Sequence, residues 1–528
     1  MTKLYTNPIL RGFNPDASIL RVGDDYYIAT STFEWWPGVE IYHSTDLINW
    51  TVVAEPVDRP SQANLLGNYN SGSLWAPALS YDHGRFYLIY TDVKTTGIFK
   101  DTLNYLIEAP AITGPWSEPV FLNASGFDPA LFHDDDGRHY LMNMLYDHRL
   151  DHDGFAGVVM QEYDLAHHQL VGARQKIFQG TQLGNAEGPQ MLKRNGWYYL
   201  ICAAGGTGYS HAATIARARN IWGPYTVAPN TPLMTTKPHP DSPLQKCGHV
   251  SLVEITPDEW YATFITARPL KLQRGNCTLG RETGLTPIRW QDDWPYLLDG
   301  GEVPPLQSPL PSIAQDVEQR TDFSETIDFT TAKALPISLK SLRGPLGDHA
   351  QLTPAGLVLR GQQSITSLHR QSLLARRWQA FHFTATTTVD FAPTNFQTLA
   401  GLVLFYDTDN WQYLSINYDE TKHTRYLQVM VDAAGQAHYA SPRIPLPAGL
   451  VTLRAEVDHA TSQFSYQLSD NDWQLIGDGL PADQLSDDYV KAQGKLAFTG
   501  AMVGICAQDL NDHTSFATFK TFDYQERR

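Results

Sequence analysis

The sequence has 528 residues, a formal net charge of −17, and 42% hydrophobic and 12% aromatic residues. The acidic balance argues against binding to nucleic acid or to an anionic membrane surface, and the composition is too apolar and too aromatic for a disordered chain. A chain of this length exceeds the size at which a single hydrophobic core stops growing, so we expect at least two domains.

Five segments in the N-terminal part share a tight turn followed by an aromatic strand. One tyrosine marks each segment, with successive spacings of 60, 53, 59 and 62 residues: Tyr27, Tyr87, Tyr140, Tyr199 and Tyr261. Turns such as Asp-Gly and Asn-Gly are typical of β-hairpins, and a repeat of this size built only from strands is typical of a propeller blade. We therefore predict a five-bladed β-propeller over residues 1–302. The alternative, a generic antiparallel sandwich, does not explain the near-constant period.

The C-terminal part has a different pattern. Residues 303–322 contain a proline-rich stretch and are predicted to be a linker. In residues 323–528 the repeat of the first part is absent, and the runs at 400–406 and 411–417 are predicted to be consecutive strands of a β-sandwich. The predicted fold class is therefore all-β, an N-terminal five-bladed β-propeller followed by a C-terminal β-sandwich.

The repeat also aligns acidic residues. Counting back eleven or twelve residues from each marker tyrosine reaches, in chain order, Asp16, Ala76, Asp128, Glu187 and His249. Equivalent blade positions are related by rotation about the propeller axis, so the ends of the inner strands meet at the central channel. Any one of the acids could cap a turn, but three acids at equivalent positions, each near a proline in an uncharged setting, favour a functional cluster with raised pKa values.

A cluster of carboxylic acids has the chemistry that glycosidic bond hydrolysis requires. One carboxyl group protonates the leaving oxygen, and another activates water or attacks carbon. A third, ionised carboxylate nearby raises the pKa of the acid. Glu187 is one methylene longer than the two aspartates, which favours it as the proton donor.

Aromatic residues lie near the predicted channel in the sequence, and sugar rings pack their C–H faces on aromatic rings. We expect Trp75, next to the axis position of blade two, to line the site, whereas Trp35 and Trp36 fit either the site or the propeller core. Arg281 is the basic candidate, because a guanidinium group can bond sugar hydroxyls and hold a carboxylate ionised. Pairing with the adjacent Glu282 on the surface is the alternative.

Motifs for metals and phosphate cofactors are weak or missing. The four cysteines include no CxxC pair, which argues against a zinc site and a disulfide scaffold, and there is no phosphate-binding glycine motif. The run 134–137 resembles the start of a calcium-binding EF-hand loop, but Phe132 occupies the first ligand position, so we interpret the run as a hairpin turn. The first residues lack the apolar core of a signal peptide. We expect a cytoplasmic protein that does not span a membrane.

Together these motifs resemble glycoside hydrolase family 43, and within it the two-domain β-xylosidases. The residues that carry the resemblance are Gly12–Asp16, Ser31–Trp35, Trp75–Pro77, Gly126–Asp128, Glu187–Pro189, Leu244–His249 and Gly280–Thr283. The resemblance implies a propeller followed by a sandwich, and hydrolysis with inversion. It implies Asp16 as general base, Glu187 as general acid, and Asp128 as the residue that tunes and orients the acid.

The resemblance also implies residues that contact the substrate. They are Phe33, Trp75, Arg281, His249 and, from weaker motifs, Thr207 and Phe498. Phe498 would come from the sandwich and wall the pocket, which would make the enzyme exo-acting. His249 is also the candidate ligand for calcium or another divalent ion in the channel, with bound water as the alternative, although the chemistry itself requires no cofactor.

The expected function is release of D-xylose from the non-reducing ends of β-1,4-xylo-oligosaccharides, with α-L-arabinofuranosidase as a side activity. Two alternatives stay open: α-L-arabinofuranosidase as the main activity, and a sugar-binding propeller without turnover. Ala17 and Pro129 beside the acids, where related enzymes vary, leave the choice between xylose and arabinose open. A retaining fructosidase is disfavoured because its Arg-Asp-Pro and Glu-Cys motifs are Phe-Asp-Pro and Glu-Gly here. The resemblance also implies a homo-oligomer, a dimer or a tetramer.

Overall fold

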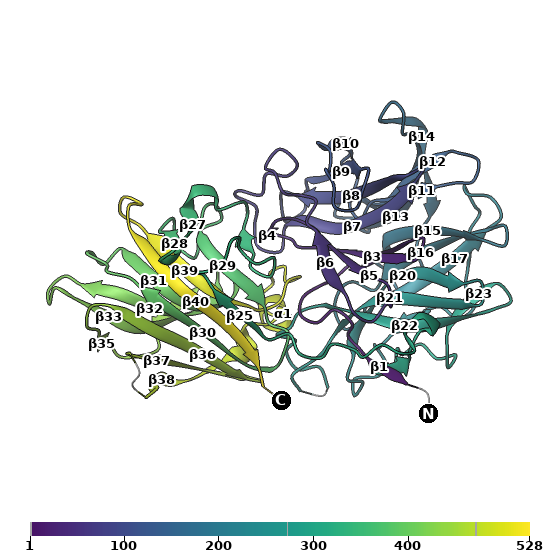
Figure 1. The fold of residues 1–528 in the computed structure, drawn as a ribbon. Coiled ribbons are helices and arrows are strands. Elements are labelled where there is room, and N and C mark those ends of the chain that lie inside the picture. Colours follow the sequence, from purple (N-terminus) through teal and green to yellow (C-terminus); the bar gives the residue numbers. More distant parts are fainter. Residues whose placement is uncertain (1–2, 272, 470–471, 528) are drawn as a thin grey trace.

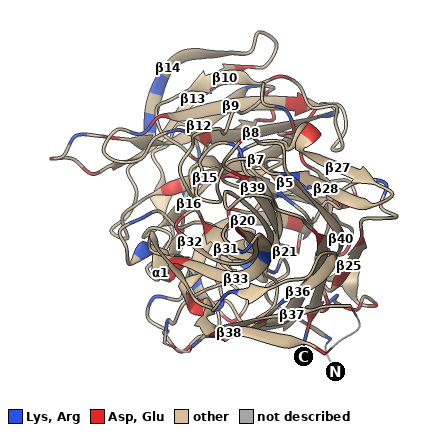
Figure 2. Cartoon of the chain, turned by 90° about the vertical axis from the view of Figure 1, so that its left-hand side faces the viewer, with Lys and Arg blue, Asp and Glu red and all other residues tan. Residues whose placement is uncertain are grey.

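The computed structural model describes residues 3–271, 273–469 and 472–527, and it consists of two β domains side by side (Figure 1). The propeller, purple to teal in the figure, is followed by the sandwich, green to yellow. The predicted fold class is therefore confirmed. Figure 2 views the chain from the sandwich side, and acidic and basic residues are interspersed over both domains. No helix within the described ranges is long and apolar enough to cross a membrane.

Five antiparallel sheets form the blades, and within each sheet the strands pair in the order in which they occur along the chain. Blade one consists of β2 (Ser18–Val22), β3 (Asp25–Thr30), β5 (Glu40–Ser44) and β6 (Thr51–Ala54). Blade two consists of β7 (Ser73–Asp82), β8 (Arg85–Val93), β9 (Thr102–Ala109) and β10 (Val120–Asn123). Blade three consists of β11 (Ala130–His133), β12 (His139–Tyr146), β13 (Phe155–Asp164) and β14 (Gln169–Phe178). Blade four consists of β15 (Glu187–Arg194), β16 (Trp197–Ala204), β17 (Ala212–Ala218) and β18 (Thr226–Val227), and β19 (Met234–Thr235) also pairs with β17. Blade five consists of β20 (Gln245–Thr256), β21 (Glu259–Ala267), β22 (Glu282–Gln291) and β23 (Trp294–Leu297).

The ring closes through contacts between the inner strands. Strand β7 contacts β2 and β11, β11 contacts β15, and β20 contacts both β16 and β2. The five marker tyrosines are buried between blades. Strand β1 (Leu4–Thr6) pairs with β24 (Gln307–Pro309), which lies within the segment 303–322 and is followed by the short helix η1 (Ser312–Ala314). The start of the chain is thereby joined to the segment that follows blade five.

The predicted hairpin turns have the expected geometry. In blade two, Asp82 pairs with Arg85 across a two-residue turn, and His83 and Gly84 both have positive φ, at 45° and 80°. Two consecutive left-handed residues define the type I′ turn that matches the twist of a β-hairpin. The run at 134–137 connects β11 to β12 as a hairpin loop, in agreement with its interpretation as a turn.

Two sheets pack face to face in the second domain and enclose its apolar core. One sheet contains β25 (Glu325–Asp328), β27 (Ala350–Thr353), β28 (Gly356–Arg360), β30 (His382–Asp390), β36 (Leu450–Asp458), β37 (Thr461–Gln467), β38 (Gln474–Pro481) and β40 (Phe516–Glu526). The other contains β29 (Ser372–Arg377), β31 (Thr398–Asp407), β32 (Asn410–Asp419), β33 (Thr424–Ala433), β34 (Gln436–Tyr439), β35 (Ile444–Pro445) and β39 (Met502–Asp509). The short helices are η2 (Gly347–His349), η3 (Ala482–Gln484) and α1 (Asp487–Lys491). The two runs predicted as consecutive strands lie in β31 and β32, which pair antiparallel.

Strand pairing and packing of aromatic rings join the two domains. Strand β4 (Trp35–Trp36) of the propeller pairs with β26 (Ser341–Leu342), which precedes the sandwich strands. Trp35 is fully buried, and its ring lies edge-on to Phe405 of β31 at 5.9 Å between centroids. The choice left open for these two tryptophans is therefore settled in favour of packing, because β4 lies in the domain interface.

Buried ion pairs also cross the interface. Lys246 of β20 places its Nζ 2.7 Å from Asp487 and 2.7 Å from Asp488, both on α1. In a second cluster, Glu40 of β5 accepts bonds from Arg377 of β29, and Lys340 lies 2.6 Å away. Removing one partner of such a buried pair costs about 3–5 kcal/mol, because an uncompensated charge remains. The ion pair with Lys246 fixes α1 beside the mouth of the propeller channel.

Candidate active site

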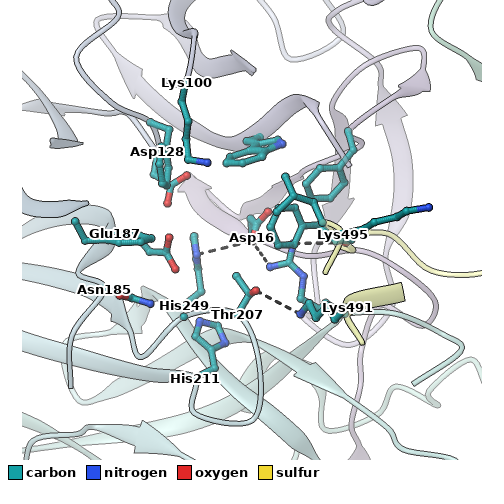
Figure 3. Close-up of a pocket in the computed structure, with 18 residues that line it drawn as sticks. Asp16, Lys100, Asp128, Asn185, Glu187, Thr207, His211, His249, Lys491 and Lys495 are labelled. Carbon is teal, nitrogen blue, oxygen red and sulfur yellow. Dashed lines mark hydrogen bonds and ion pairs between the residues drawn. The ribbon is translucent and has the colours of Figure 1, made fainter. Parts of the chain in front are cut away.

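A pocket of about 370 Å³ lies where the sandwich meets the propeller channel (Figure 3). All nine site residues predicted from the sequence line it: Asp16, Phe33, Trp75, Asp128, Glu187, Thr207, His249, Arg281 and Phe498. Its volume is in the range of small-molecule sites. Residues as far apart in the chain as 16 and 498 therefore converge on one cavity.

An unusual backbone conformation positions the inner-strand residues. Each blade has a left-handed residue in or just before the first half of its inner strand, with φ between 36° and 59°: Asp16, Ala76, Asp128, Gly188 and His249. In blades two, four and five the register of the strand shifts at this residue, as in a β-bulge. Bulges bend a strand and re-aim its side chains, and they are frequent beside active sites. The repeated bend directs one side chain of each blade toward the channel.

Blade four departs from the other blades by one residue. Gly188 occupies the left-handed position, and Glu187 precedes it as the first residue of β15. A Cβ atom on Gly188 would lie 2.8 Å from Cε1 of His249, so glycine is required both by the conformation and by the space. Counting back from the marker tyrosines therefore reached the left-handed residue itself for Asp16 and Asp128. In blade four it reached Glu187, one residue before the left-handed Gly188.

Asp16 is the most strongly stabilised anion of the cluster. Ser31 donates a hydrogen bond to its Oδ2 at 2.6 Å, and Nη1 of Arg281 lies 3.2 Å from Oδ1. Nδ1 of His249 lies 3.8 Å from the same oxygen. Burial alone would raise the pKa of Asp16, but the charges of Arg281 and His249 and the bond from Ser31 together lower it below its usual value. Asp16 is therefore ionised at neutral pH.

The other two carboxyl groups are shifted in the opposite direction. The pKa of Asp128 is raised to about 7 by burial and by the charge of Asp16, although the Gly188 N–H donates a bond to Oδ2 at 2.9 Å. The pKa of Glu187 is raised well above its usual value by burial, then by the charges of Asp128 and Asp16. Within the described part of the chain no group hydrogen-bonds the carboxyl of Glu187. Burial and the neighbouring charges therefore favour the protonated form of Glu187, and its carboxyl group is free to reach a bound molecule.

Aromatic rings form the apolar wall of the pocket. The indole of Trp75 lies edge-on to Phe127 at 5.4 Å and to Phe498 at 5.3 Å, and its Nε1 donates to the carbonyl of Ser71 at 2.9 Å. Phe33 lies 5.9 Å from Phe498. Because Phe498 follows α1 in the sandwich domain, the wall is built from both domains.

Arg281 lies inside the site, 2% exposed. Its guanidinium faces Asp16, and its Nη2 lies 3.5 Å from the carbonyl oxygen of Phe498. The alternative of a surface pair with Glu282 is wrong, because Glu282 is buried and bonded to Arg268 at 2.7 Å. Arg281 therefore supplies positive charge to the cluster.

The two histidines of the channel are buried. Burial lowers the pKa of His249, although the charge of Asp16 opposes the shift, and burial lowers the pKa of His211 to about 3. Around His249 the nearest carboxylate, Asp16, is already engaged by Arg281 and Ser31. Ca²⁺ takes six to eight oxygen ligands, and this donor set does not fit it. We assign no catalytic step to an ion at this position.

Nine further residues line the pocket and were not predicted from the sequence. They are Lys100, Phe127, Phe155, Asn185, Gly206, His211, Lys491, Lys495 and Leu496. Phe127 and Asn185 could have been predicted, because they lie one and two residues before the predicted acids Asp128 and Glu187 in the sequence. Lys491 of α1 lies 3.5 Å from Oγ1 of Thr207, and burial lowers its pKa to about 8. No local motif marks Lys491, because only the packing of α1 against the propeller brings it to the pocket.

Comparison with known proteins assigns the family. Residues 5–295 match the model of glycosyl hydrolases family 43, and residues 326–525 match the β-xylosidase C-terminal concanavalin A-like domain. The chain belongs to glycosyl hydrolase family 43. Its pocket thus contains one carboxyl group whose pKa is lowered, Asp16, and one whose pKa is raised well above its usual value, Glu187.

Relatives in this family cover the whole chain. A protein from Bacillus subtilis (strain 168) named β-xylosidase is 45% identical, over 99% of both chains. A protein from Humicola insolens named xylosidase/arabinosidase 43B is 46% identical, over 98% of this chain and 97% of that one. The crystal structure of xylan β-1,4-xylosidase from Bacillus halodurans C-125 superposes with a TM-score of 0.94 at 45% identity, over 99% of this chain and 100% of that one.

The position of Gly188 generates a prediction. In Gly188→Ala, the added Cβ displaces His249 or the bulge, and with it the N–H bonded to Asp128 and the adjacent Glu187. We expect kcat/KM on a glycoside substrate to fall about 100-fold, as for a small misplacement of catalytic groups. Gly172→Ala is the control, because Gly172 has φ +71° and open space around its Cβ position. Equal activity of the two variants would contradict this account of the bulge.

Proposed function

We propose that the chain is an inverting, exo-acting β-xylosidase that releases D-xylose from the non-reducing ends of β-1,4-xylo-oligosaccharides. One observation carries the mechanism: Asp16, whose pKa is lowered, and Glu187, whose pKa is raised, line the same pocket. Groups whose environments separate their pKa values in this way are suited to act as base and acid at one pH. The names of the relatives from Bacillus and Humicola support xylosides as the substrate class.

In the proposed reaction Glu187 donates its proton to the glycosidic oxygen as the bond from C1 to that oxygen breaks. Asp16 accepts a proton from a water molecule while the water oxygen forms a bond to C1 from the opposite face. The products are α-xylose and a shortened oligosaccharide. Asp16 ends protonated and Glu187 ionised, and proton exchange with solvent restores both. The charge of Asp128 keeps the proton on Glu187 until the leaving oxygen takes it.

Exo action is supported by the residues that close the pocket. Phe498 and Lys491 come from the sandwich domain and line the pocket together with the propeller acids. The aromatic wall of Trp75, Phe33 and Phe498 suits the C–H face of a single terminal sugar ring. We expect this covering by the sandwich domain to favour binding of the end of a sugar chain over its middle.

An α-L-arabinofuranosidase activity is the second candidate. The relative from Humicola insolens has both activities in its name, and the two sugars can present similar hydroxyl patterns. A sugar-binding propeller without turnover is disfavoured, because burying carboxylates costs stability unless the protein uses them.

The remaining expectations are part of the same proposal. Glu187 and Asp16 supply the two proton transfers, so the proposed chemistry needs no cofactor. A cytoplasmic location is supported by four buried, unpaired cysteines, which suit a reducing compartment: Cys202, Cys247, Cys277 and Cys506. A dimeric or tetrameric state stays a prediction.

Proton NMR of the anomeric signals during digestion of xylobiose tests the function. We expect α-xylose to form first, because water attacks from the face opposite the leaving group. Glu187→Gln keeps the shape of the side chain without its proton, so we expect turnover to fall about 100-fold or more while xylobiose still binds.

Initial formation of β-xylose would contradict the inverting mechanism and make Asp16 a nucleophile. Release of arabinose from arabinosides without release of xylose would show that arabinosides, and not xylo-oligosaccharides, are the substrate. If Glu187→Gln kept nearly full turnover of xylobiose, the assignment of the acid would be wrong.

The pKa shifts generate a prediction for pH dependence. The acid works while protonated, so activity falls as pH rises through the raised pKa of Glu187. Asp128→Asn removes a negative charge that favours protonation of Glu187, so its pKa falls and the alkaline limb of kcat/KM moves to lower pH. Asp151→Asn, at a side chain 85% exposed, is the control for loss of one charge and should leave the limb in place. An unmoved limb in Asp128→Asn would rule out the tuning role.

A further inference from the structure

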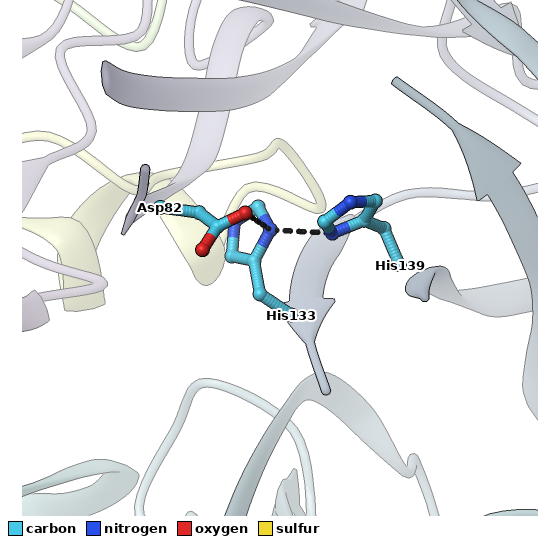
Figure 4. A group of neighbouring side chains, drawn as sticks. All are labelled: Asp82, His133 and His139. Atoms are coloured by element: carbon cyan, nitrogen blue, oxygen red, sulfur yellow. Dashed lines mark hydrogen bonds and ion pairs between the residues drawn. The ribbon is translucent and has the colours of Figure 1, made fainter. Parts of the chain in front are cut away.

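A second cluster of ionisable side chains lies between blades two and three (Figure 4). One carboxylate oxygen of Asp82 and one ring nitrogen each of His133 and His139 lie within 4.8 Å of one another. Asp82 ends the inner strand β7, His133 ends the inner strand β11, and His139 begins β12. His133 and His139 are directly paired across the two strands. Three potential ligand atoms from two blades therefore converge on one point.

The geometry of the cluster is close to that of a zinc site. Nδ1 of His133 lies 2.8 Å from Nδ1 of His139 and 3.8 Å from Oδ2 of Asp82. With Zn–N bonds of about 2.0–2.1 Å, two nitrogens of a tetrahedral site lie about 3.3 Å apart. Binding of an ion between the two histidines would therefore require their Nδ1 atoms to move apart by about 0.5 Å. His83, in the turn after Asp82, has its Nδ1 2.8 Å from Asp82 Oδ2, within reach of a fourth position.

The surroundings of His133 prepare its Nδ1 for this role. Its other ring nitrogen, Nε2, lies 3.0 Å from the hydroxyl of Ser80, and its ring packs on Tyr87 at 5.2 Å between centroids. A hydrogen bond at one nitrogen directs the other to a metal, and such outer partners orient metal-binding histidines.

Within the described residues, one other group of three potential metal ligands has its ligand atoms within 4.8 Å of one another, but a cation of the chain already neutralises it. Cys277, Asp487 and Asp488 also converge, but the ammonium group of Lys246 lies 2.7 Å from each of the two aspartates. A cation of the chain itself therefore satisfies that group. The Asp82, His133 and His139 cluster has two imidazole ligands in place of such a cation.

We propose that Asp82, His133 and His139 bind one Zn²⁺ ion, with water or His83 in the fourth position. Two imidazole nitrogens and one carboxylate oxygen are a donor set for zinc and related transition metals, whereas calcium and magnesium prefer oxygen ligands. No sequence motif indicates this site, because the two histidines follow Asp82 by 51 and 57 residues along the chain. The run at 134–137, rejected as a calcium loop, is the loop between the two histidines.

The site is structural. Asp128 precedes β11 and His133 ends it, so the two residues lie at opposite ends of the inner strand, roughly 16 Å apart at the rise of an extended chain. The ion would lie on the face of the propeller opposite the catalytic pocket. It would join the turns of blades two and three and stabilise the folded chain by preferential binding.

The test uses the full-length chain without a polyhistidine tag, stripped of metal with a chelator. Titration with ZnCl₂ by calorimetry gives stoichiometry and affinity, and titration with CoCl₂ gives a visible absorption spectrum that reports coordination. The variants are His139→Ala and the isosteric Asp82→Asn, which keeps the test available if the histidine variant does not fold. His167→Ala is the matched control, because His167 forms an exposed pair with Asp164 at 2.7 Å.

We expect one Zn²⁺ per chain, an intense tetrahedral Co²⁺ spectrum, and affinity at least about tenfold weaker in His139→Ala and Asp82→Asn. His167→Ala and His249→Ala should bind as the parent does. No binding by the parent, affinity equal to that of the parent in both cluster variants, or an octahedral Co²⁺ spectrum would overturn the proposal. Loss of binding in His249→Ala alone would place the ion in the catalytic channel and also overturn it.

Discussion

Burial of three carboxyl groups beside one guanidinium is the constraint on which the site depends. Asp16, Asp128 and Glu187 are each less than 9% exposed, and Arg281 faces them. Because burial disfavours charge, the cluster cannot hold three anions at neutral pH. Asp16 stays ionised beside Arg281, and the pKa values of Asp128 and Glu187 rise. Burial thus lowers the stability of the fold but separates the pKa values of a base, Asp16, and an acid, Glu187. Hydrolysis of a glycosidic bond requires such a pair.

Both domains contribute residues to this buried pocket. The propeller brings the acids together, because a left-handed residue in or just before the first half of each inner strand bends the backbone toward the channel. The sandwich adds Phe498, Lys491 and helix α1, which cover the open side of the pocket. Buried pairs such as Lys246 with Asp487 hold α1 in place. The packing between the domains is therefore part of the site, since it limits access of water and raises the cost of charge.

Much of the fold and site could be predicted from the sequence, for a physical reason. A propeller repeats one structural unit, so the period of the tyrosines identifies the blades and aligns Asp16 with Asp128. The exact position of the bulge at Gly188 could not be predicted, because the spacing of the tyrosines varies by more than one residue from blade to blade. Lys491 and the cluster of His133 and His139 were missed because tertiary packing and strand pairing, and no local motif, bring these groups together. The pairing of β24 with β1 inside the proline-rich segment was unforeseen for the same reason.

The most direct measurement is the protonation state of Glu187 itself. Carboxyl ¹³C NMR of the chain labelled in its glutamate side chains, with Glu187→Gln to assign the signal, reports this state as a function of pH. The account predicts that the Glu187 carboxyl is protonated at neutral pH and titrates well above the ordinary range of a glutamate. A Glu187 signal that is ionised at neutral pH and titrates in the ordinary range would contradict the account, because the pocket would then have no proton to donate.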